Sequence, residues 1–532
     1  MSVSRIKSTA LAIPGDGFGG TKYRAADGSL ERKVLEQMGL VRRGFSQLGR
    51  FSPFFNVQEL KPEKLEQLTR YQRMQRAIAT ELKPYKKLEP IRTVLNRAEL
   101  TLDFIKRLPE YIEIAGIREK YTVDNSSKHD PLEDMGVYLI KKLIEENGLD
   151  VDQVDALYVA TTTSRANDPP ITSRILSRLS NENRGKYPAE VLEKWKTKVI
   201  AEGCVGSVKA LDEIERDMFL KKANVAIVLY LANNSMHMKG NNPHEIINYG
   251  DGGAGMLIVS SDDSSGPLVF GTENFKLTQA AAVTHNMKRP ENISLWARVL
   301  EHFHSNVVSS KKVAKDISNR VPPYMLELMK SSRTSINDYN HIFLSQTSAG
   351  VVKRIELAIA EDYGTSIGIE RLTRKGSENI YDYFYKLVDS GKQVDSDIYE
   401  ALNDTERNLL EFMMLLHDTV VRVYQIHGYT GVASIPMALA HYVKEGLVDL
   451  DKDNLLLVAS GLGGKIQGAN MLNSKVKQPH PAKPILIEKP NPETIESLGD
   501  NDGHSSNRNG SANNSPKGSR LKEWLPVGLR LW

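Results

Sequence analysis

Cys204 is the only cysteine in this chain of 532 residues, and its surroundings favour a reactive thiol. It lies in the segment VIAEGCVGSVKAL, residues 199–211, where an apolar strand should end at a glycine and a helix should begin. The unpaired N–H groups and the positive dipole end of a helix N-terminus stabilise a thiolate, which makes a cysteine nucleophilic near neutral pH. The segment therefore suggests covalent catalysis; the alternative is a small buried core residue.

The composition of the chain sets broad limits on its class. Its length exceeds the ~250 to 300 residues of a single hydrophobic core, which predicts two packed halves. Lys and Arg number 70 against 66 Asp and Glu, a net charge of +4, and this balance argues against a nucleic-acid or anionic-membrane partner. One cysteine and no charged-then-apolar leader at Met1 indicate the reducing cytoplasm.

Unbroken apolar runs alternate with amphipathic segments along most of the chain. The runs predicted to be strands are residues 4–13, 156–163, 199–202, 224–231, 255–260, 339–344 and 454–459. The segments predicted to be helices are residues 136–148, 205–220, 349–363, 409–424 and 434–445. The segment at 409–424 is too short and too polar to span a membrane. Continuous apolar strands between helices indicate an α/β fold with sheets covered on both faces.

The same pattern predicts how the chain is divided. Residues 1–265 and 266–476 form two similar halves, with a helical insertion at about 15–110 and a second insertion at about 371–415. The first insertion has the spacing of a solvated helical hairpin, and its many basic residues could also dock a carrier protein. Residues 477–532 are rich in Pro, Gly, Ser and Asn, so a flexible tail is expected there.

Six segments follow one another in an order that points to a known family. They are AGIREK at 115–120, DALYVATTT at 155–163, the cysteine segment, NYGDGGAG at 248–255, HGYTGVASIP at 427–436 and SGLGG at 460–464. Together they resemble the motifs GIRER, ATT, FGDGAGA and HGNTSAASVP of the thiolase-fold condensing enzymes. Within these the chain is most similar to β-ketoacyl-acyl carrier protein (ACP) synthase III and its acyltransferase relatives.

The resemblance implies a fold and a mechanism. The fold would be thiolase-like α/β, with mixed sheets in five αβαβα layers, in a homodimer. Cys204 stands where the family's acyl-accepting cysteine lies, so it would carry the acyl group as a thioester. The backbone N–H groups of Cys204 and Gly463 would hold the oxyanion, and Arg118 and Gln346 would bind substrate.

The chain departs from the family at two catalytic positions. Ser345 stands where the family has a histidine, and Tyr429 stands where it has an asparagine. A hydroxyl and a phenol donate hydrogen bonds, but they lack the basicity of an imidazole near pH 7. Both should line the site together with His427. His427, His237 or Glu202 could activate the second substrate; alternatively, the histidines are structural and the carboxylate caps a helix.

The acyl donor is expected to be an acyl-ACP or acyl-CoA thioester, with no bound cofactor. The family's tryptophan and arginine for the adenine of coenzyme A have no counterpart before residue 115, which favours an acidic carrier protein docked on the basic residues of 32–107. No metal site is expected, because His302, His304 and the other scattered histidines have neither a second cysteine nor the spacing of a His-x-x-x-His pair.

The sequence thus predicts an acyltransferase or ketosynthase of specialised lipid or polyketide biosynthesis. One alternative is a decarboxylating enzyme that forms carbon–carbon bonds with an altered site. The other is a partner subunit without catalytic activity that shapes the tunnel of an active synthase.

Overall fold

The computed structural model describes residues 3–15, 18, 20–26, 29–30, 108, 110–113, 115–123, 130–164, 169–236, 247–261, 269–274, 309–369, 381, 383–385, 388, 396–461 and 465–472. Most of the predicted insertion at 15–110 and the whole predicted tail lie outside these residues. The predicted boundary between the halves, at residues 265 and 266, also lies outside them.

The first sheet is mixed and has the strand order β1-β7-β6-β4-β5. Its strands are β1 (Val3–Ala12), β7 (Gly252–Ser261), β6 (Val225–Ala232), β4 (Ala156–Ala160) and β5 (Lys196–Ile200). Strand β4 runs parallel to both β5 and β6, and β7 runs antiparallel to β6 and β1.

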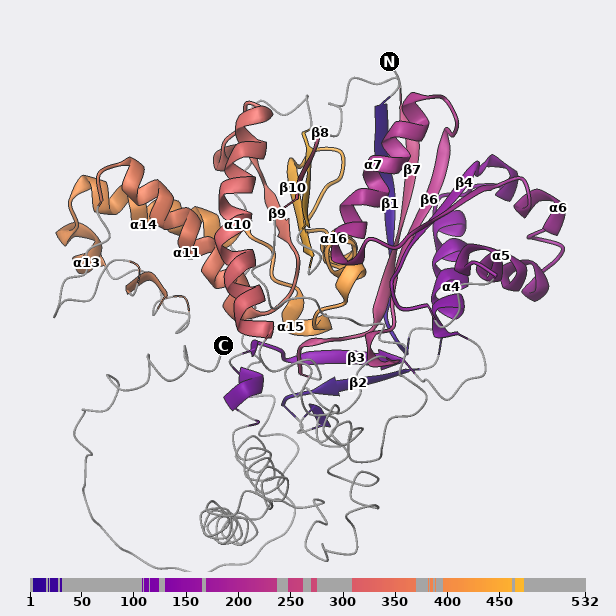
Figure 1. Ribbon diagram of the computed structural model, residues 1–532, viewed down its shortest axis with the longest axis horizontal. Coiled ribbons are helices and arrows are strands. Elements are labelled where there is room, and N and C mark those ends of the chain that lie inside the picture. Colours follow the sequence, from indigo (N-terminus) through magenta and orange to yellow (C-terminus); the bar gives the residue numbers. More distant parts are fainter. Residues whose placement is uncertain are drawn as a thin grey trace, which may run out of the picture. The chain divides into compact units, whose positions relative to one another are not determined.

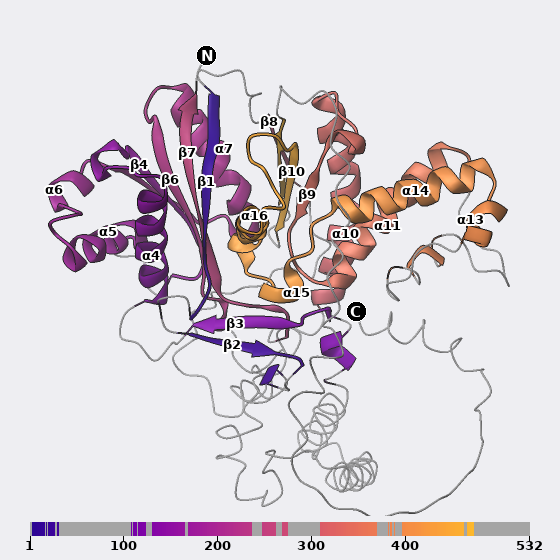
Figure 2. The same cartoon turned by 180° about the vertical axis from the view of Figure 1, so that it is seen from behind.

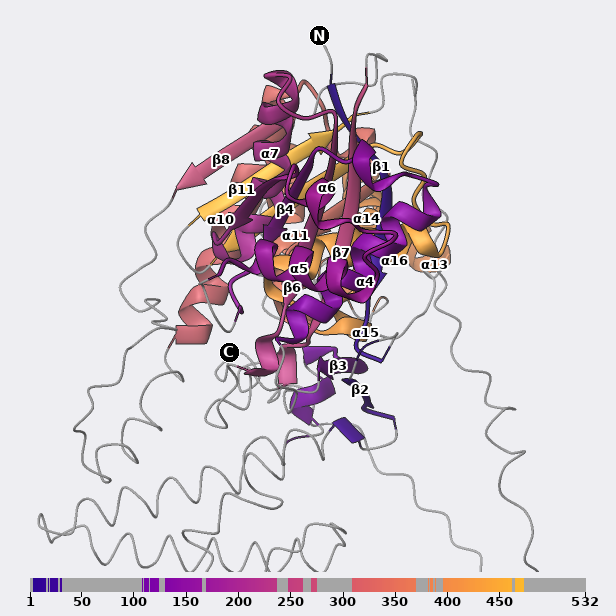
Figure 3. The same ribbon diagram turned by 90° about the vertical axis from the view of Figure 1, so that its right-hand side faces the viewer.

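The second sheet repeats the connectivity of the first. Its order is β8-β11-β10-β9, built from β8 (Val269–Asn274), β11 (Lys465–Met471), β10 (Leu455–Gly461) and β9 (His341–Leu344). Strand β9 is parallel to β10, while β11 is antiparallel to both β10 and β8. Figure 3 shows β8 beside β11. The predicted α/β fold with mixed sheets is thereby confirmed.

Helices cover the sheets on their outer faces and also fill the space between them (Figure 1). The first sheet carries α4 (Pro131–Glu146), α5 (Ile171–Glu182) and α6 (Ala189–Leu192) on its outer side, as the view from behind shows (Figure 2). Helices α7 (Gly206–Phe219) and α16 (Ser434–Lys444) lie between the two sheets. The second sheet is covered by α10 (Ser309–Ser331) and α11 (Ala349–Ser366).

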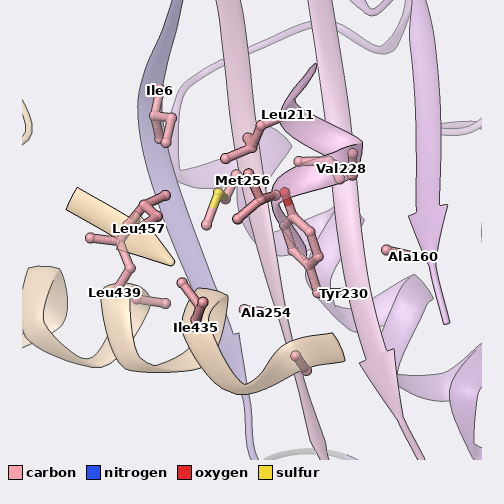
Figure 4. Packing of buried hydrophobic residues seen from close by; sticks show 14 of the residues in the cluster. Ile6, Ala160, Leu211, Val228, Tyr230, Ala254, Met256, Ile435, Leu439 and Leu457 are labelled. Carbon is pink, nitrogen blue, oxygen red and sulfur yellow. The ribbon is translucent and has the colours of Figure 1, made fainter. Parts of the chain in front are cut away.

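Central strands bury both of their faces, which explains their unbroken apolar sequences. On β6, Val228 and Tyr230 face the helices between the sheets, whereas Ile227 and Leu229 face α4. Figure 4 shows the central core, where Ile435 and Leu439 of α16 approach Met256 of β7. Burying apolar surface stabilises the fold by ~25 cal/mol per Å². Strands that are buried on both faces therefore form the most stable part of the core.

The remaining elements lie around these layers. Strands β2 (Gly20–Arg24) and β3 (Glu119–Val123) form a two-stranded antiparallel sheet next to α15 (Tyr424–His427). Helices α13 (Ser396–Ala401) and α14 (Asp404–Thr419) fall largely within the predicted second insertion. Short 3₁₀ turns complete the elements: η2 (Val151–Gln153), η3 (Gly203–Val205), η4 (Asn234–Met236), η5 (Ile336–Asp338) and η6 (Gly431–Ala433). No helix among the described residues combines the length and the hydropathy of a membrane span.

Candidate active site

Cys204 lies in the turn between β5 and α7, in agreement with the predicted change from strand to helix. The 3₁₀ turn η3 precedes α7, and Gly203 has a φ of 59°, a conformation that glycine adopts without strain. The side chain of Cys204 is partly buried, and the cysteine is free. It sits two residues before the N-terminus of a helix of the central layer.

A second turn of the same shape faces the cysteine turn. Turn η6 leads into α16 as η3 leads into α7, and Gly431 has the same φ of 59° as Gly203. The two turns touch: a Cβ atom added at Gly206 would lie 3.0 Å from Cγ2 of Val432. Residues from both halves of the chain therefore meet beside Cys204.

Tyr429, two residues before Gly431, supplies the one side-chain hydrogen bond to the sulfur that the described residues show. Its phenol Oη donates to Sγ of Cys204. The tyrosine is buried, and its ring packs against that of Tyr249 with centroids 5.2 Å apart. Burial, with the nearby Cys204 and Tyr249, raises the pKa of Tyr429 well above its ordinary value of 10.0. The phenol is therefore neutral and can act as a hydrogen-bond donor.

The thiol itself has a raised pKa, so the expected thiolate at rest is wrong. Burial raises the pKa of Cys204 above its ordinary value of 9.0, while the hydrogen bond from Tyr429 and one from the cysteine's own backbone act in the opposite direction. Desolvation disfavours a charged sulfur, and here it outweighs the hydrogen-bond donors. Cys204 consequently carries its proton near pH 7 and becomes a thiolate only as it reacts.

The loop that carries Tyr429 is paired with the turn before β7. The N–H of Tyr429 donates to the carbonyl of Asn248 over 2.6 Å, and its carbonyl accepts from the N–H of Gly250 over 3.1 Å. Glycine is required here, because a Cβ atom at Gly250 would lie 2.1 Å from the carbonyl oxygen of His427. Two of the motifs noted in the sequence, at 248–255 and 427–436, thus form one unit.

Two residues at this unit carry contacts that the sequence did not reveal. Asn234 follows β6, and its Nδ2 donates to the carbonyl oxygens of Gly250 at 2.8 Å and of Tyr429 at 3.3 Å. The fully buried carboxylate of Asp251 accepts from the backbone N–H and the hydroxyl of Ser235. The only sequence pattern that could have pointed to Asn234 is the polar run that directly follows the buried strand β6.

Ser345 and Gln346 lie after β9, where their side chains bond to backbone groups. The hydroxyl of Ser345 accepts from the N–H of Ser460 at 3.0 Å and donates to its carbonyl at 3.5 Å. The amide of Gln346 donates to the carbonyls of Leu344 and Val421 and accepts from the N–H groups that begin α15. Both side chains brace the backbone, and among the described residues neither bonds to Cys204.

His427 is buried, and neither of its ring nitrogens has a hydrogen-bond partner among the described residues. Its ring lies 5.9 Å from that of Tyr121 and 5.3 Å from that of His441. Burial, together with His441, Lys22 and Lys444, lowers the pKa of His427 from 6.5 to about 3. The imidazole is neutral at physiological pH.

Of the other predicted site residues, Arg118 and Glu202 make their hydrogen bonds and ion pairs with partners other than Cys204. Arg118 has an exposed side chain, and its backbone pairs with Gln425 and Ala25. Glu202 makes no capping bond to η3; instead it pairs with Lys465 at 2.8 Å. Gly463 and His237 lie outside the described residues.

No group of three or more His, Cys, Asp or Glu side chains able to hold a metal ion occurs in the described part of the chain. A cavity of about 980 Å³ lies between α10, α11 and α14. Its described lining includes Met329, Arg333 and Phe412 but none of the predicted site residues. This cavity is therefore separate from the thiol chemistry.

Comparisons with known proteins agree with the resemblance. A family model for the C-terminal part of 3-oxoacyl-[acyl-carrier-protein] synthase III matches residues 404–471. A β-ketoacyl-[acyl-carrier-protein] synthase III of Lactococcus lactis subsp. cremoris strain SK11 is 22% identical over 360 residues, which are 67% of this chain and 88% of the relative.

A solved structure extends the likeness over more of the chain. The 3-oxoacyl-(acyl-carrier protein) synthase of Burkholderia xenovorans LB400 is 12% identical, covers 88% of this chain and 93% of its own, and has a TM-score of 0.50. This likeness shows the fold, and the predicted resemblance is confirmed. The chain is thus similar to β-ketoacyl-[acyl-carrier-protein] synthase III, and its fold is thiolase-like α/β.

Proposed function

We propose that the chain transfers acyl groups through a thioester on Cys204, with an acyl-ACP or acyl-CoA as donor. The observation that carries the proposal is the hydrogen bond between the phenol of Tyr429 and the sulfur of Cys204, formed where two helix-leading turns meet. A partly buried thiol whose sulfur accepts a hydrogen bond from a fixed phenol is suited to a reaction in which negative charge appears on the sulfur only briefly.

The loading step balances without a cofactor. The sulfur of Cys204 attacks the carbonyl carbon of the donor thioester and forms a new carbon–sulfur bond. The bond to the carrier sulfur breaks, and the proton of the Cys204 thiol ends on the carrier thiol. Because burial raises the pKa of Cys204, the hydrogen bond from Tyr429 has to stabilise the sulfur as its proton leaves.

The acceptor would belong to specialised lipid or polyketide biosynthesis in the cytoplasm, and the working form would be a homodimer. These predictions rest on the resemblance and on the single cysteine. The curated relative from Lactococcus is named for an acyl-carrier-protein synthase, which supports a carrier protein as donor. Decarboxylating condensation has less support, because the hydroxyl of Ser345 already bonds to the backbone of Ser460.

Acyl loading tests the proposal directly. The full chain is incubated with acyl-CoA and acyl-ACP thioesters of several lengths, and the intact mass is followed by peptide mapping. We expect one acyl group on the peptide that contains Cys204 and none in a Cys204→Ala variant. A correctly folded wild-type chain that gains no acyl mass from any donor would contradict the proposal.

That negative result would favour a second candidate, a partner subunit without catalytic activity. The raised pKa of Cys204 is the specific observation in its favour, since a protonated thiol is a poor nucleophile. Mixing the chain with an active synthase and measuring the product chain length would then separate the two functions.

A further inference from the structure

We propose that Asn234 is a positioning residue that holds the phenol of Tyr429 on the sulfur of Cys204. The inference rests on the acyl transfer proposed above and names a residue that acts through Tyr429. It is drawn from the hydrogen bonds around the Tyr429 backbone, where Asn234 supplies the one side-chain contact among the described residues.

The orientation of the Asn234 amide is fixed by its partners. Its nitrogen lies 2.8 Å from the carbonyl oxygen of Gly250 and 3.3 Å from that of Tyr429. Carbonyl oxygens only accept hydrogen bonds, so the NH₂ group and not the amide oxygen must face them. One side chain thus ties the end of β6 to the turn before β7 and to the loop after α15.

Asn234 itself is held by the next residue along the chain. The N–H of Ser235 donates to Oδ1 of Asp251 at 2.8 Å, and the hydroxyl of Ser235 bonds to Oδ2. The same oxygen accepts from the N–H of Val123 on β3 at 2.8 Å. Because Asp251 is fully buried, this anchor is shielded from water.

These hydrogen bonds fix the direction in which the side chain of Tyr429 points. The Tyr429 carbonyl accepts from Asn234 and Gly250, and its N–H donates to Asn248, so the backbone is held from both sides. The phenol then reaches Sγ of Cys204. A donor aimed at sulfur stabilises the thiolate more than the thiol, so losing its aim lowers the thiolate fraction at a given pH.

The test measures how fast iodoacetamide alkylates Cys204 in the full chain from pH 6 to pH 10, using intact mass. Tyr429→Phe removes the donor and should move the pH profile upward by about one unit. Asn234→Ala should move it in the same direction. The double variant Asn234→Ala with Tyr429→Phe should move it no further than Tyr429→Phe alone, because Asn234 acts only through the phenol.

Asn147→Ala is the matched control, since Asn147 also donates two hydrogen bonds, to Ser8 and to Leu143, at the end of α4. Its profile should stay at that of the wild type. Asn234→Ser is a second variant in case Asn234→Ala does not fold, and it should give a smaller shift. The proposal would be overturned if the pH profile of alkylation stayed unchanged in folded Asn234 variants. It would also be overturned if Asn234→Ala shifted the profile equally with tyrosine and with phenylalanine at position 429. Alkylation needs no acyl donor, so a failure of acyl transfer is seen separately.

Discussion

At the scale of single residues, the site combines the partly buried thiol of Cys204 with the buried phenol of Tyr429. The phenol of Tyr429 can donate one hydrogen bond, and the sulfur of Cys204 accepts it. Burial raises the pKa of both groups, so each is neutral at rest. Reactivity then depends on how much the hydrogen bond lowers the cost of charge on sulfur as the acyl donor arrives.

Ser345 should matter more for stability than for loading. Replacing it with alanine leaves the buried N–H of Ser460 without its partner. We expect Ser345→Ala to lower the free energy of unfolding by about 1 to 3 kcal/mol in urea titrations. The rate of acyl loading on Cys204 should remain near that of the wild type. Ser345→Thr keeps the hydroxyl and serves as the control; a tenfold loss of loading in folded Ser345→Ala would contradict this role.

His427 should make the chain sensitive to acid. Its pKa is about 3 in the folded chain, below the ordinary 6.5, so the unfolded chain takes up the proton first. Stability is therefore fully present above pH 6.5 and is lost as the pH falls toward 3. Between pH 7 and pH 5 the wild type should lose about 2 kcal/mol more than His427→Phe. Urea titrations at the two pH values measure this, and equal losses would show that His427 is accessible to protons in the folded chain.

At the scale of elements, apolar runs predicted the strands that are buried on both faces. The runs at 224–231 and 454–459 became β6 and β10, each shifted by one or two residues. Strands β8 and β11 were missed because neither holds an unbroken apolar run: VFGTEN has only two adjacent apolar residues, and KIQGANM alternates apolar with polar or glycine residues. Their pairing with neighbouring strands, which no local pattern encodes, decides their structure.

The sequence predicted only those site residues whose own residue type or motif position indicates their chemistry. The lone Cys204 and the aligned Tyr429 were named from the sequence, and the structure brings them together. Gln346 was predicted to bind substrate, and its four bonds to backbone groups were not foreseen, because three of those groups lie 75 to 78 residues away in the chain. Asn234 was missed for the same reason: its partners lie 16 and 195 residues away.

The contact between the turn before β7 and the loop after α15 leaves no room for a side chain. Gly250→Ala would place a Cβ atom 2.1 Å from the carbonyl oxygen of His427, a backbone atom that cannot move aside as a flexible side chain could. We expect a loss of at least about 3 kcal/mol in unfolding free energy, with loss of acyl loading. Gly350→Ala in α11 meets open space and should be neutral or stabilising by up to about 1 kcal/mol. Similar stabilities for the two variants would argue against the close contact.

At the scale of the whole molecule, ion pairs join segments that are far apart in the chain. Glu202, next to the cysteine turn, pairs with Lys465 at the start of β11, and both side chains are more than a third exposed. Glu356 of α11 pairs with Arg422, which precedes α15, and the glutamate is 4% exposed. The two ion pairs should differ in strength, because water screens the exposed pair of Glu202 and Lys465 but has little access to Glu356.

Neutralising each glutamate should reveal this difference. We expect Glu202→Gln to change the unfolding free energy by less than about 1 kcal/mol. Glu356→Gln leaves the guanidinium of Arg422 without its partner carboxylate in a buried place and should cost about 3 to 5 kcal/mol. Urea titrations at low and high salt give both values. Equal effects would mean that the Glu356 pair is open to solvent.

The repeated turn ahead of α7 and α16 makes the framework nearly twofold, while its chemistry is one-sided. Position 204 holds sulfur, and the corresponding place in the second turn holds the inert side chain of Val432. The second turn contributes the side chain of Val432, and Tyr429 just ahead of it donates a hydrogen bond to the sulfur. Under the proposed function, the one cysteine of the chain would hold one acyl group as a thioester, and the second acyl group of a joining reaction would arrive on its own carrier.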